Sequence, residues 1–282
     1  MPLPTPPDLP ILPTPRERAL LILMNPDASI EGFTAVVEGD PSLTAAVLRA
    51  ANSAMSWPSH PIRSASEGVV RLGSVAVKHL ITTSLIRSQF STIEAAGIDA
   101  DELWRHLLGC ALLCEVQAGD DESAAQTAFT AGLLHDLGRL AMAAQAPTRY
   151  RQVVRAAQEG VDARVAERDL FGIDHAEFGQ QICERWSLPD EVTEATGGHH
   201  EAGHGVNEEV SILAPSLPAE GLTLARSIIS GLGIGDGVRR PDKRDDAAEN
   251  HPLIVGLGGR VEFMDAIRWF RESTHGRHRN VA

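Results

Sequence analysis

The sequence has few cysteines, few aromatic residues and no long apolar run. Its cysteines, Cys110, Cys114 and Cys183, form no CxxC pair, and three scattered thiols without a disulfide framework are typical of a reducing cytoplasm. Aromatic residues make up 4% of the 282 residues, so Ala, Leu and Val carry most of the hydrophobic 43%. No segment approaches the roughly 20 apolar residues that cross a bilayer. We therefore expect a soluble, cytoplasmic protein without a membrane span.

Basic residues are also in deficit, with 25 Lys and Arg against 38 Asp and Glu and a formal net charge of -13. Such a chain repels phosphate backbones and anionic lipid, which disfavours nucleic acid and membrane surfaces as partners. Residues 1–15 lack a charged n-region and an uninterrupted apolar stretch, so we expect a proline-rich arm there and not a signal peptide. GxSxG, GxxxxGK and GxGxxG sequences are absent, which leaves serine-hydrolase, nucleoside-triphosphatase and Rossmann interpretations without support.

Helix-start signals, by contrast, recur along the chain. In each, a short polar side chain precedes a glutamate or a proline: Thr14, Asp40, Ser64, Asp99 and Asp174. Apolar residues follow at helical spacing, and the alternating runs that would indicate strands are missing. The pattern predicts an all-α protein. It has the arm at 1–15, helical parts at 16–95 and 96–235, and a polar linker with one helix, near 260–273, in 236–282.

Histidines stand on the apolar side of four predicted helices: His106, His135, His175 and His199, with His200 next to the last. A single inward histidine is usually a core residue that bonds a backbone carbonyl or a carboxylate. Four of them, with Asp136 beside His135, instead favour one shared site for a transition metal such as Zn, Fe, Mn or Ni. Ligands at the ends of neighbouring helices can converge on such a cation.

Other reactive side chains on these helices have a plainer interpretation. Cys110 and Cys114 are one turn apart and could touch a metal, but buried cysteines on an apolar helix face are more commonly packing residues. The remaining histidines, His79 among them, are expected in loops or on the surface. The linker interpretation covers residues 233–252, which are rich in Gly, Pro and mixed charge.

Six stretches occur in an order that resembles the HD-related output domain, HDOD, a regulatory branch of the HD metal-dependent phosphohydrolase superfamily found in bacterial signalling proteins. They are EGDPSLTAAVLRAANSAM (38–55), IRSASEGVVRLGSVAVKHL (62–80), LWRH (103–106), AFTAGLLHDLGRL (128–140), AERDLFGIDHAEFGQQICERWSLPDEV (166–192) and GHH (198–200). The resemblance covers about residues 11–235. It implies an HD-like helical bundle at 16–235, with an N-terminal helical subdomain packed on an HD-type subdomain.

The resemblance also implies roles for the histidines. His106 matches the first histidine of the HD pattern and His135–Asp136 its central pair, which hold metal in the catalytic members. His175 and the run His199-His200-Glu201 are similar to later histidines of the HD-GYP phosphodiesterases. These residues are therefore the candidate metal ligands.

Departures from the family pattern count against catalysis. The helix expected at 221–233 holds no acid where the final metal-binding aspartate should lie, and Arg226 falls near that position. Arg139 replaces the lysine of HDxGK, and AGHGVNEE replaces the DGxGYP loop of HD-GYP enzymes. A guanidinium in place of a carboxylate removes one anionic ligand and adds positive charge near the cation.

The favoured interpretation is a non-catalytic signalling module with a degenerate metal site, beside which Arg139, Arg226 and Glu201 line a ligand pocket. We expect it to act through a signalling partner, through a small anionic ligand such as a nucleotide, or through self-association as a homodimer. The alternative is a working metal-dependent phosphohydrolase, in which Asp174, Glu177 or Glu201 must replace the absent ligand. A nucleic-acid-binding regulator has the least support, because no helix carries a clear row of Lys and Arg.

Overall fold

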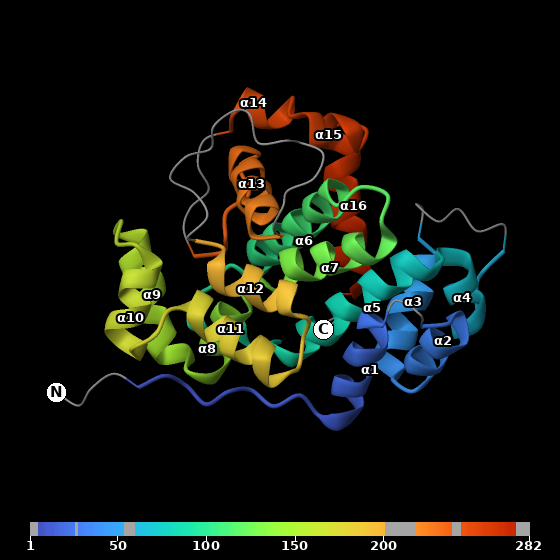
Figure 1. The fold of residues 1–282 in the computed structure, drawn as a ribbon, viewed down its shortest axis with the longest axis horizontal. Coiled ribbons are helices and arrows are strands. Elements are labelled where there is room, and N and C mark those ends of the chain that lie inside the picture. Colours follow the sequence, from blue (N-terminus) through green and yellow to red (C-terminus); the bar gives the residue numbers. More distant parts are fainter. Residues whose placement is uncertain (1–4, 26–27, 54–59, 201–217, 239–243, 275–282) are drawn as a thin grey trace, which may run out of the picture. The chain divides into compact units, whose positions relative to one another are not determined.

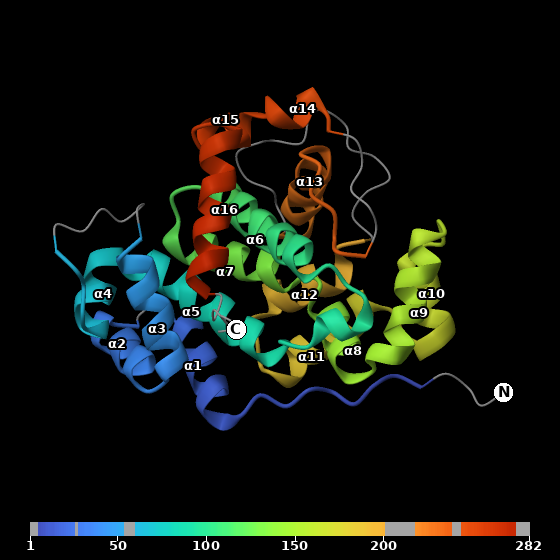
Figure 2. The same ribbon diagram turned by 180° about the vertical axis from the view of Figure 1, so that it is seen from behind.

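The chain folds entirely as helices and loops within the described residues. The computed structural model describes residues 5–25, 28–53, 60–200, 218–238 and 244–274, and no β-strand occurs in these ranges. The predicted all-α class is confirmed. Backbone contacts divide the chain into two units (Figures 1 and 2): a first unit of residues 1–11 and 90–263, and a second unit of residues 12–89 and 264–282.

The second unit contains the N-terminal helices, drawn from blue to cyan in Figure 1. They are α1 (Thr14–Met24), α2 (Ile30–Glu38), α3 (Pro41–Ala51), α4 (Ala65–Leu72) and α5 (Ser74–Gln89). Their apolar faces enclose what we call the N-terminal apolar core: Ala19, Leu23, Phe33, Val37, Leu43, Val47, Ala65, Val69, Val77, Ile81 and Leu85. The members within one helix recur at four-residue spacing, so the helical period of the sequence places this core.

Side-chain caps explain where several of these helices begin. The carboxylate of Asp40 accepts a hydrogen bond from the backbone N–H of Ser42 at 2.7 Å, and the hydroxyl of Ser64 accepts one from the N–H of Glu67 at 3.2 Å. Each cap satisfies an N–H group that has no partner inside the helix. The start predicted at Thr14 differs: α1 begins at this residue itself, and no side chain caps it.

Helix α5 is enclosed on all sides rather than amphipathic. Residues 77–86 are all buried, polar side chains included. The expectation that His79 lies in a loop or on the surface is therefore wrong: it is 2% exposed, and its ring centroid lies 6.0 Å from that of Phe270. A 3.6-residue period cannot reveal a helix that is covered all round.

No single helix in the described part of the chain combines the length and apolarity that a membrane crossing requires. The bent pair of α4 and α5, at 118° to each other, satisfies that test by length and composition alone.

The first unit contains the helices from η2 to α15 and the candidate site. They are the 3-10 helix η2 (Ile93–Ala96), α6 (Ala100–Gln117), α7 (Glu122–Leu134), α8 (Leu137–Gln145), α9 (Pro147–Gln158), α10 (Ala163–Phe171), α11 (His175–Arg185), α12 (Asp190–Gly198), α13 (Pro218–Gly231), α14 (Asp246–Glu249) and α15 (Pro252–Gly256). Helix α6 packs on α7 and α13, and α11 packs on α8 and α12. The sequence-expected helix near 260–273 is confirmed as α16 (Arg260–Thr274).

Glycines bring the helices of the first unit into backbone contact. A Cβ atom on Gly132 of α7 would lie 2.7 Å from the Cα of Ala111 on α6, and one on Gly138 of α8 would lie 2.0 Å from the carbonyl oxygen of His175 on α11. Both distances are too short for any side chain, so only glycine permits these crossings. The two crossings carry residues from α6, α7, α8 and α11 to one interior point.

Part of the predicted polar linker is packed against the first unit. The carbonyl of Gly237 accepts a hydrogen bond from the N–H of Asp99 at 2.9 Å, and Val238 is 3% exposed. The residues directly after α13 therefore belong to the structure around the site, a placement that composition alone does not indicate.

Candidate metal centre

His135 and Asp136 lie where two helices meet. α7 ends at Leu134 and α8 begins at Leu137, so His135 is the C-cap of one helix and Asp136 the N-cap of the next. The apolar pattern runs on through His135 and does not reveal this break. Because of the break, both side chains reach the same point, with Nε2 of His135 at 3.6 Å from Oδ2 of Asp136.

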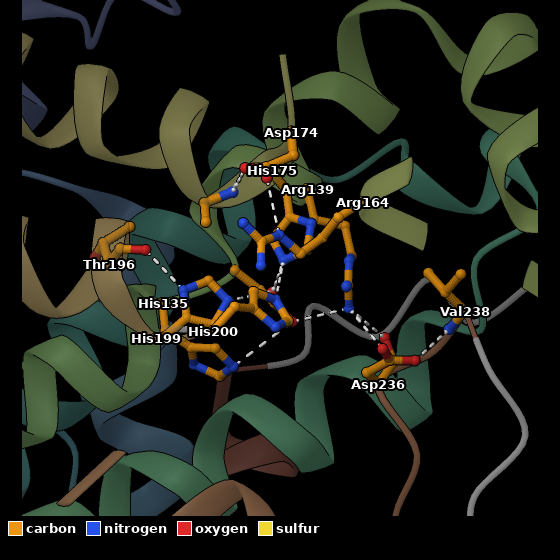
Figure 3. A network of polar contacts seen from close by, with 12 residues as sticks. His135, Arg139, Arg164, Asp174, His175, Thr196, His199, His200, Asp236 and Val238 are labelled. Carbon is orange, nitrogen blue, oxygen red and sulfur yellow. Dashed lines mark hydrogen bonds and ion pairs between the residues drawn. The ribbon is translucent and has the colours of Figure 1, made fainter. Parts of the chain in front are cut away.

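Two histidines use the free carbonyls at helix C-termini to orient their rings. Nδ1 of His135 lies 2.8 Å from the carbonyl oxygen of Gly132. Nδ1 of His199 lies 2.7 Å from the carbonyl oxygen of Thr196 (Figure 3). Carbonyls in the last turn have no partner inside the helix. Donation from Nδ1 leaves the lone pair on Nε2, and Nε2 of His199 lies 3.6 Å from Oδ1 of Asp136.

A buried carboxylate orients the third ring. His175 opens α11, and Oε2 of Glu167 lies 2.6 Å from its Nδ1 and 2.9 Å from its backbone nitrogen. The hydroxyl of Tyr150 donates to the other carboxylate oxygen of Glu167 at 2.7 Å. The Nε2 atom of His175 then lies 3.2 Å from Oδ1 of Asp136 and 2.9 Å from Nε2 of His200. Sequence reasoning missed Glu167, whose only signal was an acid on the buried side of a helix.

His106 completes the convergence from the side of α6. Its Nε2 atom lies 3.2 Å from Nε2 of His135 and 3.8 Å from Sγ of Cys110, and all three residues are buried. All six predicted metal ligands are thus brought together around Asp136, and we call them the histidine centre: His106, His135, Asp136, His175, His199 and His200. Cys110 joins them although its predicted role was packing.

Arg139 contacts the other carboxylate oxygen of Asp136 and also pairs with Asp236. Nη1 of Arg139 lies 2.9 Å from Oδ2 of Asp136 and 3.0 Å from a carboxylate oxygen of Asp236 (Figure 3). Arg139 is 2% exposed. Sequence reasoning missed Asp236, because it stands alone between glycines in the stretch that was predicted to be a linker.

Of the other two residues predicted to line the pocket, the structure describes Arg226 but not Glu201. Nη1 of Arg226, on α13, donates to the carbonyl oxygen of His199 at 2.6 Å, so this arginine lies beside the centre. α13 begins at Pro218, earlier than predicted, and therefore includes Glu220, but that side chain is exposed. Glu201 lies outside the described residues.

Burial and ion pairing determine which groups of the metal-free centre are charged. Burial lowers the pKa of His199 to about 4, so its ring is neutral at pH 7. Burial also opposes the charged form of Asp136, but Arg139 outweighs it and holds the pKa of this carboxyl well below its usual value. In the same way, Glu167 overcomes burial and raises the pKa of His175 to about 9. The centre therefore combines a carboxylate, neutral rings and one imidazolium.

The donor set fits a transition-metal ion. Nε2 of His199 is buried and has no hydrogen-bond partner among the described residues, while its Nδ1 is engaged by a carbonyl. Metal-bound histidines have this arrangement. Two groups bring ligand atoms within 4.8 Å of one another: His106, Cys110 and His135, and His175, His199 and His200. Binding at His175 would require its Nε2 to release a proton.

Comparisons with known proteins identify the family and support the fold. The family model described as HDOD domain matches residues 9–202. An HDOD domain protein with unknown function from Geobacter sulfurreducens has a TM-score of 0.66 at 24% identity, over 95% of this chain and 93% of that chain. A Shewanella amazonensis SB2B protein, provisionally named a phosphohydrolase, has a TM-score of 0.66 at 22% identity, over 94% and 92% of the two chains.

A curated relative extends beyond this chain. An uncharacterized protein from Treponema pallidum (strain Nichols) is 24% identical over 204 residues, which are 71% of this chain and 39% of that protein. The solved structures support the fold, and the family model covers most of the sequence, including every described residue of the histidine centre. The chain belongs to the HDOD domain family.

Proposed function

We propose that this chain is a non-catalytic regulatory module of bacterial signalling, working in the cytoplasm. The observation that carries the proposal is the buried ion pair between Asp136 and Arg139, at 2.9 Å. Metal-assisted hydrolysis needs a ligand set that holds the cation firmly and leaves a coordination position for activated water. A guanidinium bound to the central carboxylate offsets the charge that would hold such a cation.

The acids that could replace the missing ligand support the same proposal. Asp174 accepts hydrogen bonds from the first N–H groups of α11 and one from Nε of Arg164 at 2.8 Å. Glu177 is exposed on the surface. Asp236 is engaged by Arg139, at 3.0 Å. Among the described residues, these acids are committed to other contacts or point to solvent.

Binding, rather than turnover, would transmit the signal. We expect a protein partner, a second copy of this chain or a small anionic ligand such as a nucleotide. The half-buried Arg226 supplies positive charge beside the neutral ring of His199, an arrangement that suits phosphate oxygens. A divalent metal held by the histidines would add a Lewis acid to the same site.

The test is a phosphodiesterase and phosphatase assay with Mn²⁺, Fe²⁺ or Ni²⁺ against cyclic dinucleotides and nucleotides. The wild type and His135→Ala should both show background rates. Arg139→Lys, which restores the lysine of the HDxGK pattern, is the matched variant and should also be inactive, because the final acid is still absent. Turnover by the wild type that disappears in His135→Ala would overturn the proposal.

A metal-dependent phosphohydrolase is the second candidate. The orientation of the rings of His135, His175 and His199 toward Asp136 favours it, and two of the structural neighbours are provisionally named phosphohydrolases. It requires stoichiometric metal in protein purified with oxygen or without it. Elemental analysis that finds only trace metal in both preparations would remove this candidate.

A further inference from the structure

Cys110 adds a sulfur atom to one side of the histidine centre. It lies one turn after His106 on α6, and its Sγ is 3.8 Å from Nε2 of that histidine. Nε2 of His135 lies 3.2 Å from the same nitrogen, and the three ligand atoms are all within 4.8 Å of one another. Each of the three residues is at most 5% exposed.

The two separations measured from Nε2 of His106 are close to those of a tetrahedral zinc site. Zinc bonds of about 2.05 Å to nitrogen and about 2.3 Å to sulfur place two nitrogens about 3.3 Å apart, and nitrogen and sulfur about 3.6 Å apart. The measured separations from Nε2 of His106 are 3.2 Å to the nitrogen of His135 and 3.8 Å to the sulfur of Cys110. The third separation, from Nε2 of His135 to Sγ of Cys110, is within 4.8 Å.

The helix crossing explains why the cysteine reaches the site. Gly132 brings α7 against the backbone of α6, where a Cβ atom on it would lie 2.8 Å from the carbonyl oxygen of Cys110. The carbonyl of the same glycine orients His135 through Nδ1, at 2.8 Å. Nδ1 of His106 is buried and has no hydrogen-bond partner among the described residues, so that ring is held by its Nε2 contacts rather than by a backbone bond.

We propose that His106, Cys110 and His135 bind Zn²⁺, with the Cys110 thiolate as the anionic ligand. The other anion of the centre, Asp136, is paired with Arg139, and α13 contributes Arg226 where an acid was expected. A thiolate therefore supplies the negative charge that the set would otherwise lack, and its softness selects zinc over Mg²⁺ or Mn²⁺. On binding, one S–Zn bond forms, and the thiol proton passes to the buffer.

Cys114 provides a matched control within the same helix. It lies one turn beyond Cys110, is 5% exposed and lines a cavity of about 420 Å³ together with Gln117 and Gly221. It belongs to neither group of converging ligand atoms. Serine at position 114 should therefore leave metal binding unchanged, although it changes a buried thiol of the same helix.

The experiment uses Co²⁺ as a spectroscopic substitute for zinc, added without oxygen to the full-length, metal-free chain. The wild type and Cys114→Ser should develop a near-ultraviolet thiolate-to-cobalt charge-transfer band that saturates at one equivalent. Cys110→Ser should lack the band and bind Zn²⁺ at least ~10-fold more weakly. A wild type without the band, or a band retained in Cys110→Ser, would overturn the proposal.

A second measurement covers the case in which Cys110→Ser does not fold. X-ray absorption of the wild type with one equivalent of Zn²⁺ should contain a sulfur shell at about 2.3 Å. A shell of nitrogen and oxygen alone would overturn the proposal. The inference deepens the proposed function by naming its cation, but its failure is distinguishable: phosphodiester turnover would defeat the regulatory proposal and leave the cobalt band in place.

Discussion

The N-terminal apolar core and the histidine centre are both buried, but different forces hold them together. The first is formed by side chains such as Leu23, Phe33 and Val47, which are at most 1% exposed and carry no charge. The second hides Asp136 and Arg139 at 1% and 2% exposure. Burial of apolar surface stabilises the first region directly, whereas a buried charge is costly unless it is paired.

The comparison indicates what each region tolerates. An apolar core depends on volume and shape, so a substitution of similar size changes little. In the histidine centre, nearly isosteric changes alter charge or hydrogen bonding and leave a partner unsatisfied. The apolar core can therefore vary in sequence without consequence for the site, whereas the histidine centre is sensitive to single atoms, protons and metal ions.

Removal of the buried guanidinium should have the largest effect. Arg139→Met leaves Asp136 without its cation and should lower the free energy of unfolding by about 3–5 kcal/mol, measured by denaturant unfolding of metal-free protein. Arg268→Met is the matched control, because its partner Asp265 is 45% exposed and Arg268 itself 60%. The control should lose less than about 1 kcal/mol. Equal losses in the two variants would contradict the distinction between paired burial and surface pairing.

A methyl group at the α8–α11 crossing should have the next largest effect. Gly138→Ala places a Cβ atom 2.0 Å from the carbonyl oxygen of His175, so the helices must separate at a cost of about 3 kcal/mol. Separation also moves His175 from Asp136, and metal affinity should fall in an equilibrium titration. Gly256→Ala has open space around its new methyl group and should be neutral or stabilising. A stable Gly138→Ala with unchanged metal affinity would show that the crossing does not position the site.

Acidification should lower the free energy of unfolding of the metal-free protein, because histidines of the centre are buried in the neutral form. Burial lowers the pKa of His106 and of His199 to about 4. Below pH 6.5 the unfolded state therefore binds more protons than the folded state, and the free energy of unfolding decreases as the pH is lowered. Glu167 raises the pKa of His175 to about 9 against burial, so its contribution is complete below 6.5 and is lost as pH rises through 9. Stability should therefore be greatest near pH 6.5–7 and fall by about 2 kcal/mol in one further unit of acidification.

The measurement is the free energy of unfolding at each pH in the presence of a chelator. His79 of the second unit also has a pKa lowered to about 3, chiefly by burial, and adds to the acid limb. The pair of substitutions His106→Asn and His199→Asn should flatten that limb more than His79→Asn does. If only His79→Asn changed the pH profile, acid sensitivity would belong to the second unit and the prediction for the histidine centre would be wrong.

A volume-conserving change in the N-terminal apolar core should have the smallest effect. Leu43→Met replaces a side chain that is 2% exposed with one of similar volume and should lower the free energy of unfolding by less than about 1.5 kcal/mol. Metal affinity and the shape of the pH profile should not change. A Leu43→Met variant with an altered pH profile would show that the two regions are coupled rather than independent.

The sequence predicted more of the helices than of the site. Caps such as Asp40 and Ser64 are local, because acceptor and donor stand two or three residues apart, and they place helix starts correctly. The six residues that the sequence named as candidate ligands lie together in the structure. The break between His135 and Asp136 was not visible, because apolar residues flank it on both sides. Glu167 and Asp236 were missed for another reason: each acts on a residue from a different helix.

What the sequence by itself determined is therefore the helical class, the positions of most caps and the residue types that could bind a metal, since these depend on neighbours within about four residues. The tertiary structure alone decided which charges meet. The pairing of Arg139 with Asp236, the contact of Glu167 with His175, and the approach of Cys110 to His135 all depend on contacts between different segments of the chain. Gly132 and Gly138 permit the close approach of α7 to α6 and of α8 to α11. The apolar period within one helix does not indicate which other helix it packs against.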